Sequence, residues 1–497
     1  MFKNFPGYKL LERIQKKKSH KRERKLPLNA IKLIFIVAIT SIIALLPTES
    51  FGIEGLTVVH QRIISLFVFA ALMWLTEAMP SWVTSMIVVT IMLLTVSTSA
   101  FNFLRPEDGA GLVPFKSIMA CFANPTIMLF IGGFVLAIGL TKVKLDVALA
   151  RVLLKPFGTR SEIVLLGFIL VTAIFSAFVS NTATAAMMLA FLTPVLKSLP
   201  ADGKGRIALA LAIPVGANLG GMITPIGTPP NMIALDYLSS QGMGISFVDW
   251  TIKMAPFVII LLLLSWLLLR VLFPFKQKHI KIEIEGDIKW DRHTWSVVAA
   301  FVITIFMWMF GTDLWGVDTN VVAMIPIAIF CATGILTRRD LEEINWSVLW
   351  MVAGGFALGV ALNYKDASSV SLSSLIVNTV PFDNFSPLVV MILAGIICFG
   401  FSNFISHSAA TSLLVPVLGV VAGGLGASLD SYGGPQAMLV GIAIASSVSM
   451  ILPISTPPNA IAHSTGFIEQ KDMMKVGIII GLMGLALGYA MLIFIGF

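Results

Sequence analysis

The chain has 497 residues, of which 57% are hydrophobic and only 12% are charged, and its mean hydropathy is +0.92. A soluble globular protein carries about 25% charged residues and needs a wetted polar surface. The composition therefore excludes a soluble globular protein, a disordered chain and a disulfide scaffold. It predicts an all-α polytopic membrane protein.

The net charge of +8 is concentrated at the amino terminus, because eleven of the 34 Lys and Arg residues lie within residues 1–32. A basic run can bind nucleic acid, but this one directly precedes an apolar stretch. We therefore interpret residues 1–30 as a cytoplasmic anchor that contacts anionic lipid at the cell membrane, with no nucleic acid partner. Cys121, Cys331 and Cys398 stand singly and suggest neither a disulfide nor a metal site.

Eleven stretches are long and apolar enough to predict transmembrane helices. They lie at 31–47, 57–79, 82–100, 122–141, 207–238, 252–274, 294–312, 320–337, 346–363, 433–466 and 474–496. Two further apolar stretches, 162–200 and 385–425, are each interrupted near the middle by small polar residues.

The charges between these stretches predict how the chain is oriented. Four connecting segments are basic and are expected in the cytoplasm, whereas four others carry acids with few bases and are expected outside. The basic segments are 142–160, 197–206, 270–292 and 338–339, and the acidic ones are 48–56, 101–115, 312–319 and 426–432. Each interrupted stretch then begins and ends on one face. The pattern predicts two re-entrant hairpins that enter from opposite faces.

Two motifs occur twice in the same order. Residues 130–137 (FIGGFVLA) recur as 352–359 (VAGGFALG), and residues 224–231 (TPIGTPPN) recur as 452–459 (LPISTPPN). An odd number of crossings separates the copies, so the second copy should be inverted in the membrane. Inverted repeats with interrupted helices are typical of secondary transporters, and the interruptions indicate the site.

Each Thr-Pro-Pro-Asn loop lies inside an apolar segment, with the predicted breaks at 224–231 and 452–459. Two consecutive prolines remove two backbone donors and should interrupt the helix. The freed carbonyls suit a hard cation such as sodium, and the free amides at a helix N-terminus suit a carboxylate. A simple proline kink is the alternative interpretation.

The hairpin tips carry short polar side chains, which need partners at membrane depth. The first tip reads Ser180-Asn181-Thr182, and the second allows two registers, because either Ser402-Asn403 or Ser406-His407-Ser408 could match it. We prefer the second register, which places an ionisable group at membrane depth, a costly and usually functional arrangement. Helix packing for the first tip and a neutral structural histidine for the second are the alternatives.

Together these motifs resemble those of the divalent-anion/sodium symporter (DASS) family, the INDY-type dicarboxylate transporters. The resemblance covers nearly the whole chain after residue 30. Thr76-Glu77-Ala78-Met79-Pro80 is similar to the family's early signature, and the glycine segments, the first hairpin tip and both Thr-Pro-Pro-Asn loops are similar to its other motifs. The resemblance implies eleven transmembrane helices, two hairpins, a scaffold and a transport domain, and a homodimer.

On this resemblance the chain divides into six parts. They are a basic segment (1–30), scaffold helices (31–121), a first transport repeat (122–250), scaffold helices with a cytoplasmic loop at 275–293 (251–345), an inverted second transport repeat (346–470) and a C-terminal helix (471–497).

The resemblance also implies which residues form the site. The substrate would be bound by Ser180, Asn181, Thr182, Thr228, Pro229, Ser406, His407, Ser408, Thr456 and Pro457. Sodium, if transport is coupled to it, would be bound around Ser180, Asn181, Gly227, Asn231, Ser455 and Asn459.

The second tip departs from the family pattern, since Ser406-His407-Ser408 stands where Ser-Asn-Thr is usual. An imidazole could replace a bound sodium by a built-in charge, so that the carrier cycles only when it is loaded. We therefore expect elevator-like exchange of C4 or C5 dicarboxylates (succinate, malate, fumarate, 2-oxoglutarate), with no cofactor. The intact first tip favours the alternative, a symporter with Na⁺ as coupling ion, and citrate or sulfate are alternative substrates.

Two other classes of function find little support in the sequence. A membrane enzyme would need a nucleophile–base pair or a metal cluster, but the six histidines are scattered and neither a His-Glu-x-x-His nor a Gly-x-Ser-x-Gly motif occurs. A channel would need a repeated ring of carbonyls or charges, which the sequence does not show.

Overall fold

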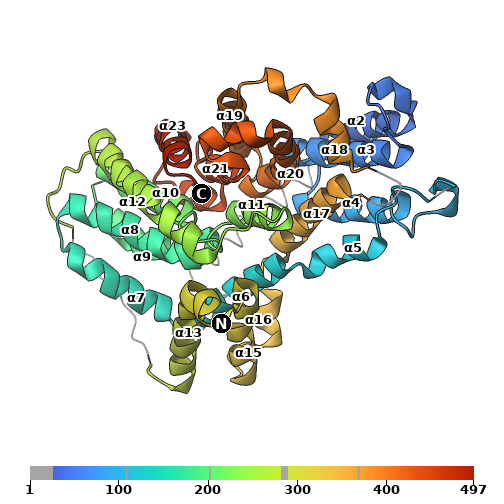
Figure 1. Ribbon diagram of the computed structural model, residues 1–497. Coiled ribbons are helices and arrows are strands. Elements are labelled where there is room, and N and C mark those ends of the chain that lie inside the picture. Colours follow the sequence, from blue (N-terminus) through green and yellow to red (C-terminus); the bar gives the residue numbers. More distant parts are fainter. Residues whose placement is uncertain (1–25, 108, 201–202, 281–288, 366–369) are drawn as a thin grey trace.

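The computed structural model describes residues 26–107, 109–200, 203–280, 289–365 and 370–497. Most of the predicted segment 1–30 and part of the predicted loop 275–293 therefore lie outside the described residues. Within them the fold is built from helices (Figure 1). The α-helices are α2 (Leu26–Leu45), α3 (Val58–Thr76), α4 (Ser81–Thr95), α5 (Phe115–Ala120), α6 (Pro125–Lys142), α7 (Leu145–Leu154), α8 (Ser161–Phe178), α9 (Asn181–Ser198), α10 (Gly205–Gly220), α11 (Pro229–Ser240), α12 (Phe247–Leu272), α13 (Arg292–Trp315), α14 (Thr319–Val322), α15 (Met324–Ala332), α16 (Arg338–Glu342), α17 (Trp346–Asn363), α18 (Leu372–Thr379), α19 (Pro387–Phe404), α20 (His407–Leu425), α21 (Gly434–Ser447), α22 (Pro457–Ser464) and α23 (Gln470–Phe494).

The prediction of an all-α polytopic membrane fold is confirmed. Nine helical segments among the described residues are long and apolar enough to cross a bilayer. Helices satisfy their backbone groups internally, which is what hydrocarbon demands of a spanning segment. The number of crossings and the re-entrant course of the two hairpins stay predictions.

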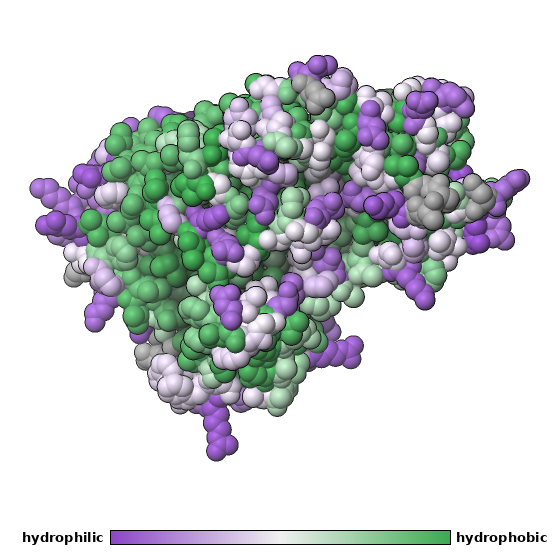
Figure 2. Space-filling model, in the orientation of Figure 1, coloured by the Kyte–Doolittle hydropathy of each residue, from purple (hydrophilic) through white to green (hydrophobic). Residues whose placement is uncertain are grey.

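Large apolar side chains also cover much of the outside of the molecule. In Figure 2 they form broad areas on the face shown, most continuously on the left of the view, while hydrophilic residues lie at its margins and in groups across its centre. A water-soluble monomer rarely exposes apolar patches of this extent, so these surfaces suit contact with lipid. Exposed examples are Ile259 and Ile260 of α12, Val302 and Ile303 of α13, and Ile396 and Ile397 of α19.

Both interrupted stretches form two helices with a short break. α8 and α9 are separated by residues 179–180, and α19 and α20 by residues 405–406. Ser180 caps α9 by accepting the Ala183 N–H, and Ser406 caps α20 by accepting the Ala409 N–H, both at 3.3 Å. A serine N-cap satisfies a backbone donor that the helix start would otherwise leave free.

These caps relate the two hairpins in register. Ser406 follows Ser180 by 406 − 180 = 226 residues, and the same offset pairs His407 with Asn181. Asn403 instead lies in the last turn of α19, where its carboxamide oxygen accepts the Ile451 N–H at 2.8 Å. The structure therefore pairs Ser406-His407-Ser408, and not Ser402-Asn403, with the first tip.

The two Pro-Pro segments break their helices as expected, with one difference in detail. α10 ends at Gly220 and α11 begins at Pro229, while α21 ends at Ser447 and α22 begins at Pro457. The prolines thus start the second half of each broken helix and do not lie inside the gap. Proline suits the first helical position, because its fixed φ is already helical and its missing N–H would have no partner there.

The paired glycine segments are points of close helix packing. A Cβ atom at Gly132 of α6 would lie 2.5 Å from the carbonyl oxygen of Ala323, and one at Gly354 of α17 would overlap Ser85 of α4. The predicted span 320–337 is divided at Ala323 into α14 and α15. The second of these helices, α15, ends at Ala332. The repeat thus uses glycine to bring α6 against α14 and α15 and, equivalently, α17 against α4.

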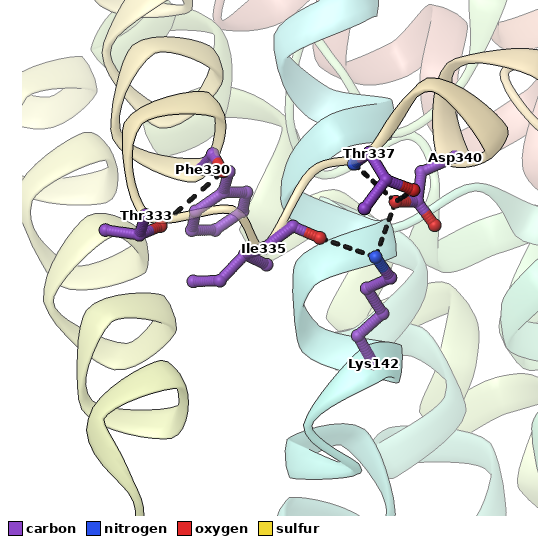
Figure 3. A network of polar contacts seen from close by, with 6 residues as sticks. All are labelled: Lys142, Phe330, Thr333, Ile335, Thr337 and Asp340. Atoms are coloured by element: carbon purple, nitrogen blue, oxygen red, sulfur yellow. Dashed lines mark hydrogen bonds and ion pairs between the residues drawn. The ribbon is translucent and has the colours of Figure 1, made fainter.

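A polar network fixes the C-terminal end of α6 (Figure 3). The Lys142 ammonium lies 2.5 Å from the Asp340 carboxylate and 2.5 Å from the Ile335 carbonyl. The same carboxylate accepts the backbone N–H and the hydroxyl of Thr337, both at 2.6 Å. α6 is therefore tied to the connection between α15 and α16, and this anchors the helix that forms one wall of the cavity described next.

Candidate functional site

A cavity of about 290 Å³ lies where the two hairpin tips meet the two helix breaks. It contains residues from segments that are more than 200 positions apart in the sequence. All ten residues predicted to bind substrate line it: Ser180, Asn181, Thr182, Thr228, Pro229, Ser406, His407, Ser408, Thr456 and Pro457. The structure brings the predicted set together, while their role in binding stays a prediction.

Four helix N-termini converge on this cavity. The N-cap residues of α9, α11, α20 and α22 are Ser180, Thr228, Ser406 and Thr456, and all four belong to its lining. Each helix start carries roughly half a positive charge through the helix dipole, although α11 and α22 begin with two prolines and offer no N–H at these two positions. Their convergence makes the cavity suited to an anion.

The lining supplies almost no fixed charge of its own. Among the described lining residues there is no Asp, Glu, Lys or Arg, and His407 is the one ionisable side chain. The charge of a bound anion would therefore be met by helix ends, hydroxyls, amides and this imidazole. A bound cation would be the other source of positive charge.

The first half of the cavity is centred on Asn181. Its carboxamide oxygen lies 2.7 Å from the Ser176 hydroxyl, which is also 2.7 Å from the Ala217 carbonyl. The side chain packs over Gly221, where an added Cβ atom would lie 2.6 Å from that oxygen. Glycine at this position thus permits the hairpin tip to approach the broken helix.

The second half is centred on His407, which is 9% exposed. Its Nε2 lies 2.6 Å from the carbonyl oxygen of Ser449. Ser449 corresponds to Gly221, because 449 − 221 = 228 is also the offset between the Pro-Pro loops. A carbonyl can only accept, so Nε2 carries the hydrogen of this contact.

The residues predicted for sodium fall into two groups. Gly227 and Ser455 line the cavity, but Asn231 and Asn459 do not. Asn231 donates to the carbonyls of Gly221 (3.0 Å) and Thr224 (2.8 Å), while Asn459 donates to those of Met450 (2.8 Å) and Leu452 (3.1 Å). These two carboxamides brace the unwound segments, and a direct contact with sodium stays a prediction for all of them.

Several lining residues were not predicted. The sequence did carry a signal for Asn218 of α10. An asparagine within an apolar segment at membrane depth is costly, and such residues are usually functional. Trp82 lies two residues after the segment 76–80, but nothing in the sequence indicated that the start of α4 reaches the cavity. The further unpredicted residues are Ser81, Phe130, Phe134, Ile226, Asn345, Ser347, Val348, Met351 and Pro458.

A second, larger cavity of about 980 Å³ borders the same helices nearer their other ends. On α17, Met351 lines the smaller cavity and Gly355 the larger one. Phe130 of α6, which lines the smaller cavity, and Phe356 of α17, which lines the larger one, are only 3% and 9% exposed.

Comparison with known proteins gives a consistent result. The family described as "Sodium:sulfate symporter transmembrane region" matches residues 28–496. An "Uncharacterized transporter" of Haemophilus influenzae is 31% identical, over 91% of this chain and 94% of its own length. The "Sodium-dependent dicarboxylate transporter SdcS" of Staphylococcus saprophyticus is 28% identical, over 85% of this chain and 83% of its own.

Two further relatives show the breadth of the similarity. The "Inorganic phosphate transporter PHO87" of Saccharomyces cerevisiae is 28% identical over 90% of this chain, which matches 47% of that protein's length. Among solved structures, the Alcanivorax borkumensis YdaH transporter matches with a TM-score of 0.53 at 12% identity, over 86% of this chain and 97% of its own. That likeness concerns the fold.

Proposed function

The chain belongs to the sodium:sulfate symporter family, a family of multi-pass transport proteins and not of enzymes, and from that premise we propose that it carries C4 and C5 dicarboxylates across the cell membrane by exchange. Succinate, malate, fumarate and 2-oxoglutarate are the expected substrates. The observation that carries the proposal is the convergence of two opposed hairpin tips and four helix N-termini on one cavity of about 290 Å³.

The arrangement suits a small molecule with two separated negative ends. One carboxylate would contact Ser180-Asn181-Thr182, and the other would contact Ser406 and Ser408 across the cavity. The two Thr-Pro segments, at 228–229 and 456–457, would close the pocket between them. Drug-sized ligands occupy cavities of about 300–1,000 Å³, so a cavity at the lower limit fits a shorter molecule.

Exchange is proposed because the second half of the cavity holds its own titratable group. His407 occupies the place that Asn181 holds in the first half, so that its imidazole could take up a proton together with the dianion and offset one of its charges. An empty carrier that kept this charge would leave it unbalanced in a poorly hydrated site. The loaded form crosses more readily, which favours exchange over net uptake.

Sodium-coupled uptake is the second candidate, and the first half of the cavity favours it. The Ser176 hydroxyl lies within hydrogen-bond distance of both the Asn181 carboxamide oxygen and the Ala217 carbonyl, and hard cations prefer such oxygen ligands. Ser180, Asn181, Gly227 and Asn231 would form this sodium site, and Ser455 with Asn459 its inverted counterpart. The relatives named sodium-dependent dicarboxylate transporters support the same alternative.

Alternating access would use these two cavities, which border α6 and α17 at different points along the two helices. We expect the repeats 122–250 and 346–470 to contain the moving body, in an elevator-like motion against the remaining helices. Since α6 packs on α14 and α15, and α17 mainly on α4, these two helices would stay with the stationary part. We further expect a homodimer, a cytoplasmic N-terminus and lipid around the apolar surface.

Ligand-induced thermal stabilisation of the purified protein tests the substrate class. A ligand that binds the folded state raises the unfolding midpoint according to its concentration relative to Kd. We expect succinate and 2-oxoglutarate to raise the midpoint, with butyrate, a monocarboxylate with the same number of carbons as succinate, as the matched control without effect. Stabilisation by sulfate or phosphate, with none by dicarboxylates, would replace the proposed substrate class by an inorganic oxyanion.

A further inference from the structure

Asn218 of α10 joins the two halves of the cavity. It is 1% exposed and belongs to the cavity lining. Its carboxamide nitrogen lies 3.2 Å from the Thr456 hydroxyl and 3.1 Å from the carboxamide oxygen of Asn459. A residue of the first repeat thus reaches into the Thr-Pro-Pro-Asn loop of the second.

The orientation of the Asn218 carboxamide is fixed by its neighbour. One end of the Asn459 side chain contacts the carbonyls of Met450 and Leu452, which can only accept. That end is therefore the NH₂ group, and the opposite end, facing Asn218, is the oxygen. Since this oxygen can only accept, Asn218 must present its own NH₂ group to Asn459 and, with it, to Thr456.

This orientation restricts what the Thr456 hydroxyl can do. Its oxygen accepts from the Asn218 carboxamide at 3.2 Å and from the backbone N–H of Asn459 at 3.1 Å. A hydroxyl has two lone pairs and one hydrogen, and both lone pairs are used here. In the part of the chain that the structure describes, no group accepts the remaining hydrogen. Thr456, a lining residue, is thus left as a hydrogen-bond donor.

The equivalent loop of the first repeat lacks this restriction. Thr228 begins α11 without a side-chain capping bond. The position that corresponds to Asn218 is 218 + 228 = 446, where the shorter Ser446 instead accepts from the Thr411 hydroxyl at 3.0 Å and donates to the Ala443 carbonyl at 3.2 Å. The Thr228 hydroxyl therefore remains able to donate or to accept.

We infer that Asn218 is a positioning residue that makes Thr456 an obligate hydrogen-bond donor, so that this end of the cavity selects a carboxylate of the substrate. The inference rests on the proposed transport of dicarboxylates and adds an asymmetry to it. The Thr456 end accommodates an anionic acceptor and disfavours a cation, whereas the Thr228 end tolerates either. Asn218 acts through Thr456 and need not touch the substrate.

Transport kinetics in proteoliposomes test this role. Asn218→Leu removes the donor at similar size, so that Thr456 regains an accepting role. We expect KM for succinate to rise about tenfold, as for the loss of one hydrogen bond to a charged group, with the maximal rate within about twofold of wild type. In a Thr456→Val background, which has no hydroxyl to position, Asn218→Leu should leave KM unchanged.

Three controls make the outcome decisive. Ser446→Ala, the matched change in the other repeat, should leave KM within about twofold of wild type. Asn218→Ser, a smaller change that cannot reach Thr456, should reproduce the KM effect, and it replaces Asn218→Leu if that variant elutes as aggregate. The wild-type protein is measured first, because this separates the test of dicarboxylate transport from the test of Asn218. A wild type that neither binds nor takes up succinate overturns the proposed function.

If the wild type transports succinate, two results would overturn the role of Asn218 while leaving the proposed function intact. One is that Asn218→Leu raises KM by the same factor in the wild-type background and in the Thr456→Val background. The other is a fall in maximal rate at unchanged KM, which is the effect of a merely structural defect.

Discussion

The two halves of the cavity share one backbone plan but differ in the side chain at the centre. Asn181 packs over Gly221, and His407 contacts the carbonyl of Ser449, at equivalent positions of the two repeats. A neutral carboxamide and an imidazole therefore occupy the same place beside the same kind of helix break. The two repeats share this geometry, while the chemistry of each half differs.

The divergence extends to the proline loops. Thr228 and Thr456 begin equivalent helices and line the same cavity, yet the hydroxyl of Thr456 alone is held by a partner from the other repeat. One half thus combines an amide with an unrestricted hydroxyl, and the other an imidazole with a donating hydroxyl. We expect a symmetric dicarboxylate to experience two different ends of one site.

The largest expected effect is the loss of transport in Asn181→Ala. This change removes the central side chain of the first half, together with its contact to Ser176. Succinate uptake into proteoliposomes should fall by more than about 100-fold, while the protein stays folded by size-exclusion chromatography. The control is Asn403→Ala, which should lower thermal stability through the lost Ile451 contact without changing KM. Full activity of Asn181→Ala would remove the first tip from the site.

The next effect concerns the difference between the halves directly. His407→Asn gives the second half the side chain of the first and removes its titratable charge. We expect succinate exchange without sodium to fall by about tenfold or more, as for the loss of a charge-assisted contact, and to recover when sodium is added. An exchange rate that is unchanged and still indifferent to sodium would mean that His407 does not balance substrate charge.

A smaller effect is expected at the Lys142–Asp340 pair, which lies in neither half. Burial acts to raise the pKa of Asp340, but the hydrogen bonds from Lys142 and Thr337 outweigh it and hold this pKa below the ordinary value. The pair should therefore stabilise the fold above the unfolded-state pKa of about 4 and lose this contribution as pH falls through the lowered folded-state pKa.

Asp340→Asn tests that expectation. It should lower the free energy of unfolding by about 1–3 kcal/mol at neutral pH, and the difference from wild type should vanish at acid pH. Thermal unfolding across a pH series measures both, and KM for succinate should stay unchanged. A constant difference at every pH would contradict the ionic origin of the effect.

The smallest effects separate two glycine positions. Gly132→Ala forces a Cβ atom to within 2.5 Å of the Ala323 carbonyl and should cost about 1–3 kcal/mol. Gly359→Ala meets no atom within 4 Å and stands where the first repeat already has Ala137 (359 − 222 = 137), so it should be neutral or slightly stabilising. Equal thermal midpoints for the two variants would show that Gly132 is not a close-packing point.

Much of this arrangement was predictable because membrane depth makes polar residues informative. Short polar residues in an apolar stretch, as at Ser180 and Ser406, have few reasons to occur except at a break in the helix, and the structure places both as N-caps. The doubled Thr-Pro-Pro-Asn motif likewise predicted both helix breaks. Proline and polarity are local signals, and a sequence displays local signals directly.

What the sequence did not predict depends on packing between distant segments. Asn218 and Thr456 are 238 positions apart, and no local pattern indicates that they meet. The division of the span 320–337 at Ala323 accompanies the close approach of Gly132, again a contact across the fold. The register of the second tip was open for a related reason, since Asn403 and His407 are both plausible until the caps and their partners are seen.

The central claim is that a titratable charge in the second half takes the place of a co-transported cation. Radiolabelled succinate uptake into proteoliposomes, measured with and without sodium and with and without internal dicarboxylate, tests it most directly. We expect uptake only into vesicles preloaded with a dicarboxylate, at the same rate with or without sodium. Uptake into empty vesicles that requires sodium would contradict it and establish symport in its place.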